Sequence, residues 1–305
     1  MKQNSYDVAI IGGGPGGYTA ALYCARSGLS VIVLEKLSPG GQMATTGQVD
    51  NYPGFDQGID GFELGERMQK SAERFGAETA FVNVTAVNLT GEMKEITTSR
   101  GIVSARAVVL ATGASPRELG LPEEKSLRGR GVAYCATCDG MMYRGKTVVI
   151  VGGGNSAAAD ALTLSKICKK VYLVHRRDTL RASNVYLDPL LKSGVELILD
   201  SQVSEILHDK KVTGVVIKHK DGSSSELACD GVFVAVGRIP DTGLFQGQVG
   251  MDEQGYLIAD ETTRTNLPGV FAVGDVRTKP LRQIVTAAAD GAVSSRYAEE
   301  YLAGT

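Results

Sequence analysis

The chain has 305 residues, enough for about two domains of roughly 150 residues each. Its 43% apolar and 22% charged residues are typical of a globular protein, and its net charge of -2 gives no support for the strongly basic surface that nucleic-acid binding normally requires. No apolar run approaches the roughly 20 residues of a membrane-spanning helix, so we expect neither a nucleic-acid nor a membrane partner.

The N-terminal segment lacks the pattern of a secretory signal peptide. Its first apolar run, residues 8–11, is too short for a signal-peptide core and leads directly into glycines. We therefore expect a cytoplasmic protein, a compartment in which structural disulfides are rare. Three isolated cysteines, Cys24, Cys168 and Cys229, lie in apolar patterns and are interpreted as small buried hydrophobic residues.

The first predicted unit is a strand, a glycine loop, a helix and a second strand. Residues 6–11 are typical of a buried parallel strand, and residues 19–27 have helical character. A G-x-G-x-x-G loop lies between them, with Gly12, Gly14, Pro15 and Gly17. A second strand is predicted over residues 31–34 and ends at the acid Glu35. Such a loop lets a pyrophosphate approach the helix N-terminus, and the acid binds ribose hydroxyls. The unit therefore suits a nucleotide with a free ribose, such as FAD.

Two more segments complete the first half of this domain. Residues 60–76 are predicted to form one helix, because Asp60 and Glu63 have capping-box spacing and Gly76 suits its C-terminal end. Residues 108–111 are predicted to be a late strand, and the glycine and proline that follow indicate that the chain crosses there to another domain.

A C-x-x-C pair, Cys135 and Cys138, precedes Asp139. A structural zinc site needs four ligands, usually from two such pairs, and the chain has no second pair, so we expect no metal. In a reducing compartment the pair is then a redox disulfide. Asp139 is either a helix cap or a proton carrier, since reducing a disulfide to two thiols consumes two protons.

A second strand–loop–helix unit follows the cysteines. Strands are predicted over residues 146–151 and 171–174, with a helix running to about residue 166 between them. Its loop and basic residues are Gly152, Gly154, Asn155, Ser156, His175, Arg176, Arg177 and Arg181. The spacing from Gly152 to His175 is 23 positions, the same as from Gly12 to Glu35. Arginines at this place attract a 2'-phosphate that a carboxylate would repel, so this unit suits NADPH.

The chain is predicted to return to the first domain near its end. Residues 232–236 are a late strand of the second unit, residues 267–275 are an apolar strand closing on Gly-Asp, and residues 283–302 form a final helix. These patterns predict an α/β fold with two Rossmann-like (three-layer ββα) nucleotide-binding domains, the second inserted into the first. Residues 1–115 and 242–305 would bind FAD, and residues 116–241 would bind NADPH and carry the disulfide.

Longer motifs run along nearly the whole chain. They are GGGPGGYTA at 12–20, GGQM at 40–43, VDNYPG at 49–54, ATGA at 111–114, CATCDG at 135–140, GGGNSA at 152–157, HRRD at 175–178, GD at 274–275 and RQ at 282–283. On these motifs the chain resembles the low-molecular-weight, bacterial-type thioredoxin reductases.

The resemblance implies a homodimeric thioredoxin-disulfide reductase with FAD and NADPH as cofactors and thioredoxin as partner. Electrons would pass from NADPH to FAD, to the Cys135–Cys138 disulfide and then to thioredoxin, with a large rotation between domains. Cys138 would be the sulfur on the flavin side, Cys135 would attack thioredoxin, and Asp139 would be the acid–base residue. The FAD site would add Lys36, Gly40, Gly41, Gln42, Asn51, Val84, Thr112, Gly113, Gly274, Asp275, Arg282, Gln283 and Ile284.

Several alternatives stay open at this point. A related flavin disulfide reductase would serve another acceptor, such as a glutaredoxin-like protein or a peroxiredoxin system. A ferredoxin-dependent variant would lack the His-Arg-Arg cluster that this chain has at 175–177. A redox-sensing or flavin-storage protein would need neither the second nucleotide site nor the C-x-x-C pair. The departures from the family pattern, Asp50 for Glu and Asp241 for Asn, do not touch the inferred chemistry.

Overall fold

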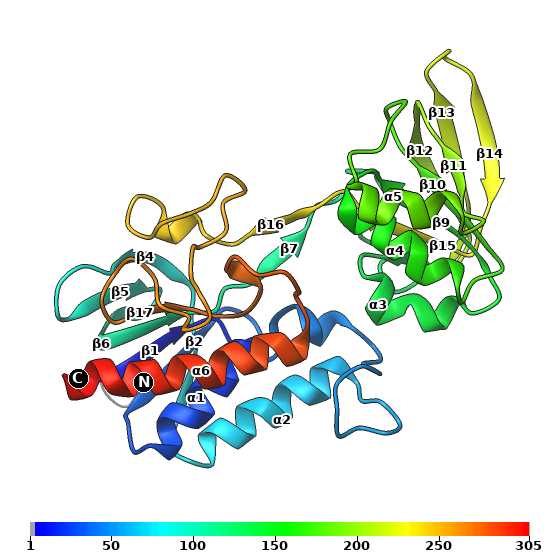
Figure 1. Cartoon of the computed structure of the whole chain (residues 1–305). Helices are drawn as coiled ribbons and strands as arrows, with labels where there is room; N and C mark the ends of the chain where they lie inside the picture. The colour runs from blue at the N-terminus through cyan, green and yellow to red at the C-terminus, as the bar shows by residue number, and fades with distance from the viewer. Residues whose placement is uncertain (1–3, 305) are drawn as a thin grey trace. The chain divides into compact units, whose positions relative to one another are not determined.

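A computed structural model of the chain describes residues 4–304, which form two compact units (Figure 1). Met1–Ser115 with Ile239–Thr305 form the split unit, and Pro116–Arg238 form the inserted unit. The two connecting segments pair with each other as short strands, β7 (Ala114–Pro116) and β16 (Arg238–Pro240). The chain therefore enters and leaves the inserted unit through one two-stranded ribbon.

The split unit is built on a seven-stranded sheet of order β3-β2-β1-β6-β5-β4, in which β17 also pairs with β6. Strands β1, β2, β3, β6 and β17 are parallel to one another, and β4 and β5 form an antiparallel extension beside β6. The strands are β1 (Ser5–Ile11), β2 (Val31–Glu35), β3 (Glu78–Phe81), β4 (Val84–Asn88), β5 (Lys94–Thr98), β6 (Gly101–Leu110) and β17 (Val270–Ala272). The helices are α1 (Pro15–Arg26), α2 (Gly61–Glu73) and α6 (Ile284–Ala303).

The central strands of the split unit are buried on both faces. On β1, Val8 and Ile10 pack in one cluster with Cys24 of α1 and Ala298 of α6. The alternate residues of β1 pack in a second cluster with the antiparallel strands and with residues 245–276. A strand buried on both faces is a continuous apolar run, which explains why β1 and β2 were recognisable in the sequence.

The inserted unit repeats this arrangement with a different periphery. A parallel sheet of order β11-β10-β9-β15-β8 lies next to an antiparallel sheet of order β12-β13-β14. The strands are β8 (Val132–Ala133), β9 (Thr147–Gly152), β10 (Lys170–Val174), β11 (Glu196–Ile198), β12 (Ser201–His208), β13 (Val212–His219), β14 (Ser224–Ala228) and β15 (Gly231–Ala235). The helices are α3 (Ala136–Asp139), α4 (Asn155–Ser165) and α5 (Asn184–Leu191).

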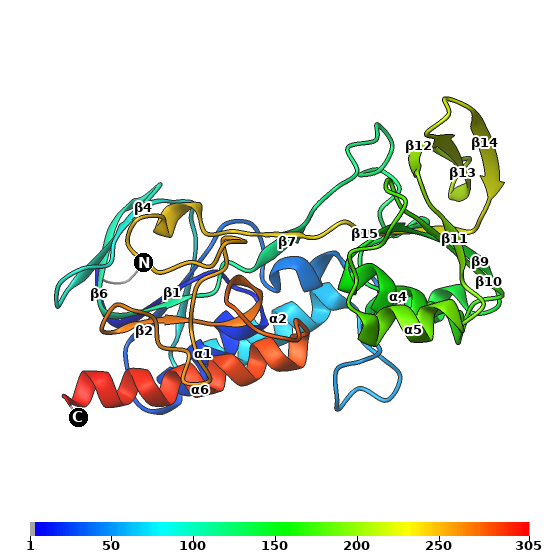
Figure 2. The same cartoon turned by 45° about the horizontal axis from the view of Figure 1, so that its top comes forward.

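Three layers are evident in the inserted unit (Figure 2). On one face of the parallel sheet, Ile150 and Leu173 pack with Leu164 of α4. On the other face, Val149 and Val174 pack with apolar residues of β12 and β13. The predicted α/β fold of Rossmann-like ββα domains is confirmed.

The helix predicted over residues 60–76 is α2, and it ends at residue 73. Asp60 is its N-cap, since the Asp60 carboxylate accepts hydrogen bonds from the backbone N–H groups of Phe62 and Glu63. The Glu63 carboxylate binds Arg67 one turn later instead of returning to Asp60. The N-cap is confirmed, whereas the reciprocal half of the capping box does not form.

The isolated cysteines are mostly as predicted. Cys24 and Cys229 are buried, and desolvation raises the pKa of each thiol to about 12. Cys168 is partly exposed and packs against the core of the inserted unit, so its predicted burial is incomplete. Within residues 4–304, no helix has both the length and the apolar character that crossing a membrane requires.

Candidate functional site

The first glycine loop joins β1 to α1 and leaves its backbone open. Gly12 has a φ of +107°, and a side chain there would meet the backbone of Ala111. A side chain at Gly17 would meet the backbone of Gly12, so helix and strand lie too close for any other residue. Gly14 has no atom within 4 Å of the position a Cβ would take, and no side chain caps the helix that begins at Pro15. Uncapped N–H groups beside open backbone are what a pyrophosphate binds.

Two segments lie against this loop. Glu35, at the end of β2, accepts hydrogen bonds from the backbone N–H groups of Gly13 (2.7 Å) and Lys36 (2.7 Å). The N–H of Gly40 donates to the Gly13 carbonyl at 2.8 Å, and a Cβ on Gly41 would lie 3.4 Å from the Gly14 Cα. The structure therefore gathers the acid and the Gly-Gly segment around one loop.

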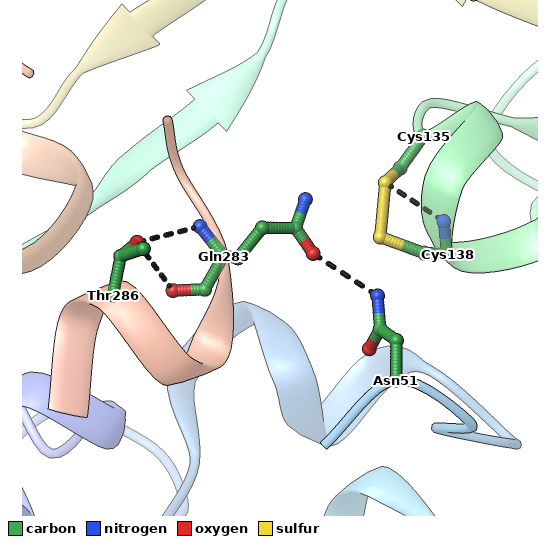
Figure 3. The surroundings of a disulfide bond; sticks show 5 residues. All are labelled: Asn51, Cys135, Cys138, Gln283 and Thr286. Atoms are coloured by element: carbon green, nitrogen blue, oxygen red, sulfur yellow. Dashed lines mark hydrogen bonds between the residues drawn. A yellow bond between two sulfur atoms is a disulfide. The ribbon is translucent and has the colours of Figure 1, made fainter. Parts of the chain in front are cut away.

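The start of α6 forms a second polar group in the split unit (Figure 3). Gln283 is the N-cap residue of α6, and its backbone N–H donates to Thr286 Oγ1 at 3.1 Å in a reciprocal capping box. Asn51 Nδ2 donates to Gln283 Oε1 at 3.0 Å. Residues 232 positions apart in the sequence are thus brought together, and Ile284 is the first residue of the helix.

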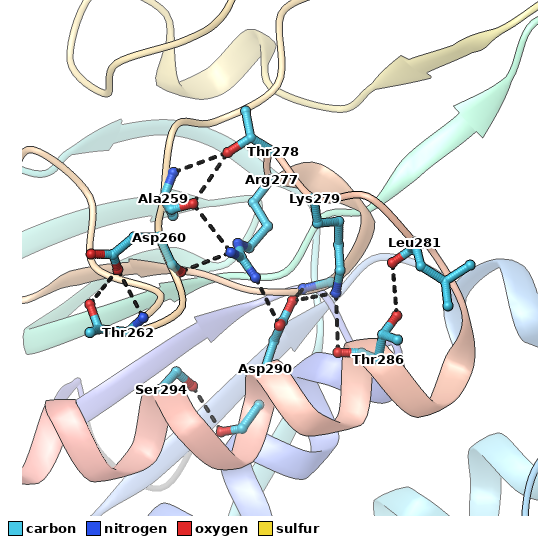
Figure 4. Close-up of polar contacts among 12 residues, drawn as sticks. Ala259, Asp260, Thr262, Arg277, Thr278, Lys279, Leu281, Thr286, Asp290 and Ser294 are labelled. Atoms are coloured by element: carbon cyan, nitrogen blue, oxygen red, sulfur yellow. Dashed lines mark hydrogen bonds and ion pairs between the residues drawn. The ribbon is translucent and has the colours of Figure 1, made fainter. Parts of the chain in front are cut away.

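A buried ion network fixes the turn before α6 (Figure 4). The Asp290 carboxylate accepts a hydrogen bond from the Gly274 N–H at 2.8 Å and pairs with Arg277 at 2.9 Å and Lys279 at 2.7 Å. All three charged residues are nearly excluded from solvent. Because a charge left unpaired in such a place is costly, the network holds the Gly274–Asp275 turn to α6.

The remaining predicted residues of the split unit are more scattered. Arg282 Nε donates to the Asp275 carbonyl at 3.2 Å, and the Arg282 guanidinium lies over the Tyr256 ring. Thr112 follows β6, and Gln42 Nε2 donates to the Ala114 carbonyl nearby. Val84 opens β4 and is half-buried against the core. The side chain of Lys36 is exposed, and Gly113 has a φ of +75°.

The second glycine loop, between β9 and α4, repeats the open backbone of the first. A Cβ on Gly152 would lie 2.5 Å from the Ala235 carbonyl oxygen. Gly154 again has nothing within 4 Å, and α4 again lacks a side-chain cap. Asn155 Oδ1 accepts a hydrogen bond from the Ser183 N–H at 2.8 Å, while Ser156 is exposed in the first turn.

His175 occupies the place that Glu35 has in the first loop. Its ring fills the space where a side chain on Gly153 would lie, and Arg181 N–H donates to the Gly153 carbonyl at 2.6 Å. His175 is 6% exposed, and burial together with the nearby arginines lowers the pKa of its imidazole. Its Nε2 is buried and has no hydrogen-bond partner among the described residues. A hydroxyl of a bound nucleotide would satisfy that nitrogen.

Cys135 and Cys138 form a disulfide at the start of α3, in the inserted unit (Figure 3). Their Cα atoms are 5.3 Å apart, and Cys135 Sγ accepts a hydrogen bond from the Cys138 N–H at 3.2 Å. Both cysteines are partly exposed, so a partner thiol can reach them. Among the described residues, no group of three or more His, Cys, Asp or Glu side chains gathers as metal ligands.

Two carboxyl groups lie close to the disulfide helix. Desolvation raises the pKa of Asp139 to about 6, against the opposing effect of Arg128. Desolvation also raises the pKa of Asp160 to about 6, although Arg238 and a hydrogen bond from the Ala136 backbone oppose it. Asp139 is the last residue of α3 and stands at the N-cap position of the 3-10 helix Gly140–Tyr143, where its side chain makes no capping hydrogen bond.

Sequence reasoning missed Asp160 and part of the second nucleotide region. Asp160 lies on α4 between the buried Ala157 and Leu164. An acidic residue among the apolar residues of a predicted helix was therefore the one signal in the sequence that could have identified it. A cavity beside Arg176 and Arg177 is completed by residues 200, 202–204 and 218–220, which lie on or next to strands β12 and β13. No motif marks those residues.

Comparison with known proteins places these features in one family. The family model described as pyridine nucleotide-disulphide oxidoreductase matches residues 6–291. A Listeria monocytogenes protein named thioredoxin reductase is 46% identical over 304 residues, covering 99% of this chain and 95% of its own. One of the same name from Streptomyces clavuligerus is 47% identical over 302 residues, covering 97% and 94%. The crystal structure of thioredoxin reductase from Streptococcus pyogenes has a TM-score of 0.92 and 43% identity, with 99% of each chain covered.

Proposed function

The chain belongs to the pyridine nucleotide-disulphide oxidoreductase family, and from that premise we propose that it is an NADPH-dependent, FAD-containing thioredoxin-disulfide reductase. The observation that carries the proposal is the Cys135–Cys138 disulfide, which lies in the same unit as the glycine loop with the basic cluster. When bound, FAD supplies the transfer of two electrons from NADPH to this disulfide.

The split unit fits FAD. Its loop offers the open backbone at Gly14, the uncapped first turn of α1 and the carboxylate of Glu35. Asp275, held in place through Gly274 and Asp290, would bind the ribityl chain, and Gln283 with Asn51 would lie by the flavin ring. The N-terminus of α6 would stabilise negative charge on the reduced ring. The other residues proposed above for FAD complete this site.

The inserted unit fits NADPH. Gly154 and the uncapped start of α4 suit the pyrophosphate, and the buried Nε2 of His175 suits a ribose hydroxyl. Arg176 and Arg177 are exposed at the end of β10, where they would bind the 2'-phosphate. These features favour NADPH over both NADH and reduced ferredoxin as the electron source.

The thiols carry the final transfer. After reduction, the Cys135 thiolate attacks the thioredoxin disulfide, forming a mixed disulfide and releasing one thioredoxin thiolate. Cys138 then attacks Cys135 Sγ, which restores the internal disulfide and releases the second thiolate. The two electrons leave with thioredoxin, and its two thiolates take up two protons. Asp139, with its pKa near 6, holds and passes a proton close to these sulfurs.

We also propose that the inserted unit rotates during turnover. It carries both the disulfide and the NADPH loop, while the flavin loop belongs to the split unit. Both donors need near-contact with one flavin ring, at about 3–3.5 Å between reacting atoms. Rotation would take place at the β7–β16 ribbon. A reversible cross-link holding the disulfide at the flavin should block flavin reduction by NADPH, and normal turnover of the locked enzyme would contradict the rotation.

The proposed activity is tested with purified protein, NADPH and a panel of oxidised acceptors. We expect rapid NADPH oxidation with thioredoxin and slow oxidation with a glutaredoxin-like protein or a peroxiredoxin. Bound flavin released from the protein should be FAD at one per chain. Absence of flavin from folded protein, or turnover with a different acceptor alone, would overturn the assignment.

Assembly and compartment complete the proposal. We propose a homodimer, as the family resemblance implies, and sedimentation of the purified holoprotein tests it. We propose a cytoplasmic location, because three of the five cysteines remain thiols and the single disulfide is of the redox type. Cell fractionation with an antibody against the chain tests the location.

A further inference from the structure

The cavity beside Arg176 and Arg177 has a second wall, formed by residues that belong to none of the sequence motifs. Its volume is about 570 Å³, within the range of small-molecule sites. Arg176 and Arg177 line it from the end of β10, and Lys218 and Lys220 line it from the end of β13. All of these residues belong to the inserted unit.

Three of the four cations around the cavity are not neutralised by protein carboxylates. Lys220 pairs with Asp200 at 3.1 Å, and Asp178 accepts a hydrogen bond from Thr179. Within residues 4–304, the side chains of Arg176, Arg177 and Lys218 have no ion-pair or hydrogen-bond partner. Three unpaired cations around one cavity repel one another unless an anion binds between them.

The two walls are held in register through Asp200. The Asp200 N–H donates to the Arg177 carbonyl at 3.0 Å, and the Asp200 carbonyl accepts from the Lys220 N–H at 2.9 Å. Asp200 has a φ of +48°, a left-handed conformation that is uncommon outside glycine. One residue with an unusual backbone thus ties the basic cluster to the hairpin that carries Lys218.

A histidine on the same hairpin stiffens this arrangement. Ser201 Oγ donates to the Leu199 carbonyl at 2.7 Å, so it accepts the proton on His219 Nδ1, 2.9 Å away. His219 Nε2 then accepts from Ser225 Oγ at 2.8 Å. Both ring nitrogens of His219 are hydrogen-bonded. His219, the neighbour of Lys218 on β13, is thus tied to β12 through Ser201 and to β14 through Ser225.

We infer that Lys218 is a further specificity-determining residue for the coenzyme, forming with Arg176 and Arg177 the two walls of one pocket for the 2'-phosphate of NADPH. The inference rests on the proposed function. A phosphate monoester carries between one and two negative charges at neutral pH, so it matches three unpaired cations. NADH lacks this group and gains nothing from Lys218.

The test compares binding of two probes, adenosine 2',5'-bisphosphate and 5'-AMP, to the FAD-containing protein by calorimetry. We expect Lys218→Ala to weaken the bisphosphate about fivefold and Lys218→Glu more strongly, with 5'-AMP little changed. Lys218→Arg should bind nearly as the wild type does. Lys211→Ala is the matched control, since Lys211 is exposed in the same hairpin and does not line the cavity.

A double-mutant cycle separates direct from distant effects. If Lys218 and Arg177 bind the same phosphate, the effects of Lys218→Ala and Arg177→Ala should be non-additive. Unchanged bisphosphate binding in Lys218→Ala, or equal weakening of both probes, would overturn the inference while Arg177→Ala still supports the coenzyme assignment. Failure of the wild type to discriminate the two probes would overturn both.

Discussion

The two glycine loops share a backbone design and differ in the residue that ends the next strand. In both, the third glycine-loop position is open and the following helix has no side-chain cap. In the first loop the carboxylate of Glu35 accepts the Gly13 N–H, whereas in the second the ring of His175 packs over Gly153. We propose that the glycine loops bind the nucleotides and that the charge at the strand end selects which nucleotide binds.

The largest expected effect separates the chemistry of the two units. Cys138→Ser in the inserted unit should abolish thioredoxin reduction, because no internal disulfide can form to accept electrons. Transfer of electrons from NADPH to an artificial dye should persist, since it needs only the two nucleotide sites. Parallel assays with thioredoxin and dye measure both. Cys168→Ser is the control, and loss of both activities in Cys138→Ser would show that the cysteine is structural.

The next effect concerns the carboxyl beside the disulfide. Asp139→Asn should slow thioredoxin reduction by about 10²-fold, the usual contribution of a general acid. The wild-type rate should fall as the pH rises above about 6, because Asp139 then loses the proton it passes on. The variant should lack this limb of the pH profile. An unchanged profile in Asp139→Asn would assign the proton to another group, such as Asp160.

The stability of the folded protein tests the raised pKa of Asp139 independently of turnover. The pKa of Asp139 is raised in the folded chain, so the folded state binds this proton more tightly than the unfolded state. Wild-type stability should therefore fall as the pH rises from about 4 to about 6. At about pH 8, Asp139→Asn should be more stable than the wild type by about 3 kcal/mol, because the pKa of Asp139 is raised by about two units and each unit is worth about 1.4 kcal/mol. Urea unfolding at several pH values measures the difference.

A smaller effect tests the difference between the acid at the end of β2 and the basic cluster after β10. Replacing Arg176 and Arg177 by alanine removes charge-assisted hydrogen bonds worth about 1.5–3 kcal/mol each. The KM for NADPH should rise about tenfold or more, with little change in the KM for NADH. Steady-state kinetics with both coenzymes measures this, with Arg100→Ala on the split unit as control. Equal weakening of both coenzymes would mean that the cluster is not the phosphate site.

The smallest effect on turnover is expected in the split unit. Asp290→Asn leaves Arg277 and Lys279 buried without their carboxylate, which should cost about 3 kcal/mol of unfolding free energy. FAD should be released more readily, yet turnover with excess FAD should stay close to normal. Denaturant titration and flavin fluorescence measure the two effects. Asp56→Asn in an exposed loop is the control, and unchanged FAD retention would contradict the positioning role of Asp290.

Much of the central architecture follows from the sequence. Strands β1, β2, β9 and β10 are short apolar runs that end at glycine loops or at charged residues, and each was expected within a residue or two. Their burial on both faces produces the pattern, because the central positions of such a strand do not tolerate a polar side chain.

The antiparallel strands were not individually predicted. In β14 exposed serines and a glutamate outnumber the apolar residues, and in β13 three consecutive apolar residues, 215–217, break the alternation expected of a half-buried strand. Most of β6 was also missed, because only its end was predicted as a strand and exposed residues such as Ile102 and Arg106 interrupt the apolar run before it. Lys218 could not be singled out for the same reason. Its proposed role depends on a cavity that two distant segments of the chain form.

The candidate site likewise contains residues that the sequence predicts and contacts that it does not. The residues within each glycine loop, within the cysteine pair and within the basic cluster lie close together in the sequence, so local spacing predicts each group. The contacts of Asn51 with Gln283 and of Gly274 with Asp290 depend on how α6 packs, which no local pattern encodes. For Asp139, adjacency suggested a role, whereas burial supplied the shifted pKa that supports it.

The central claim is that one unit binds FAD and the other selects NADPH, and an anaerobic titration of the purified protein tests it most directly. NADPH, NADH and reduced ferredoxin are added in parallel while the flavin absorbance is followed. The account predicts that two equivalents of NADPH per chain, which deliver four electrons, reduce both the flavin and the disulfide. NADH should require a large excess, and ferredoxin should be ineffective. Equal reduction by NADH and NADPH, or reduction by ferredoxin alone, would contradict it.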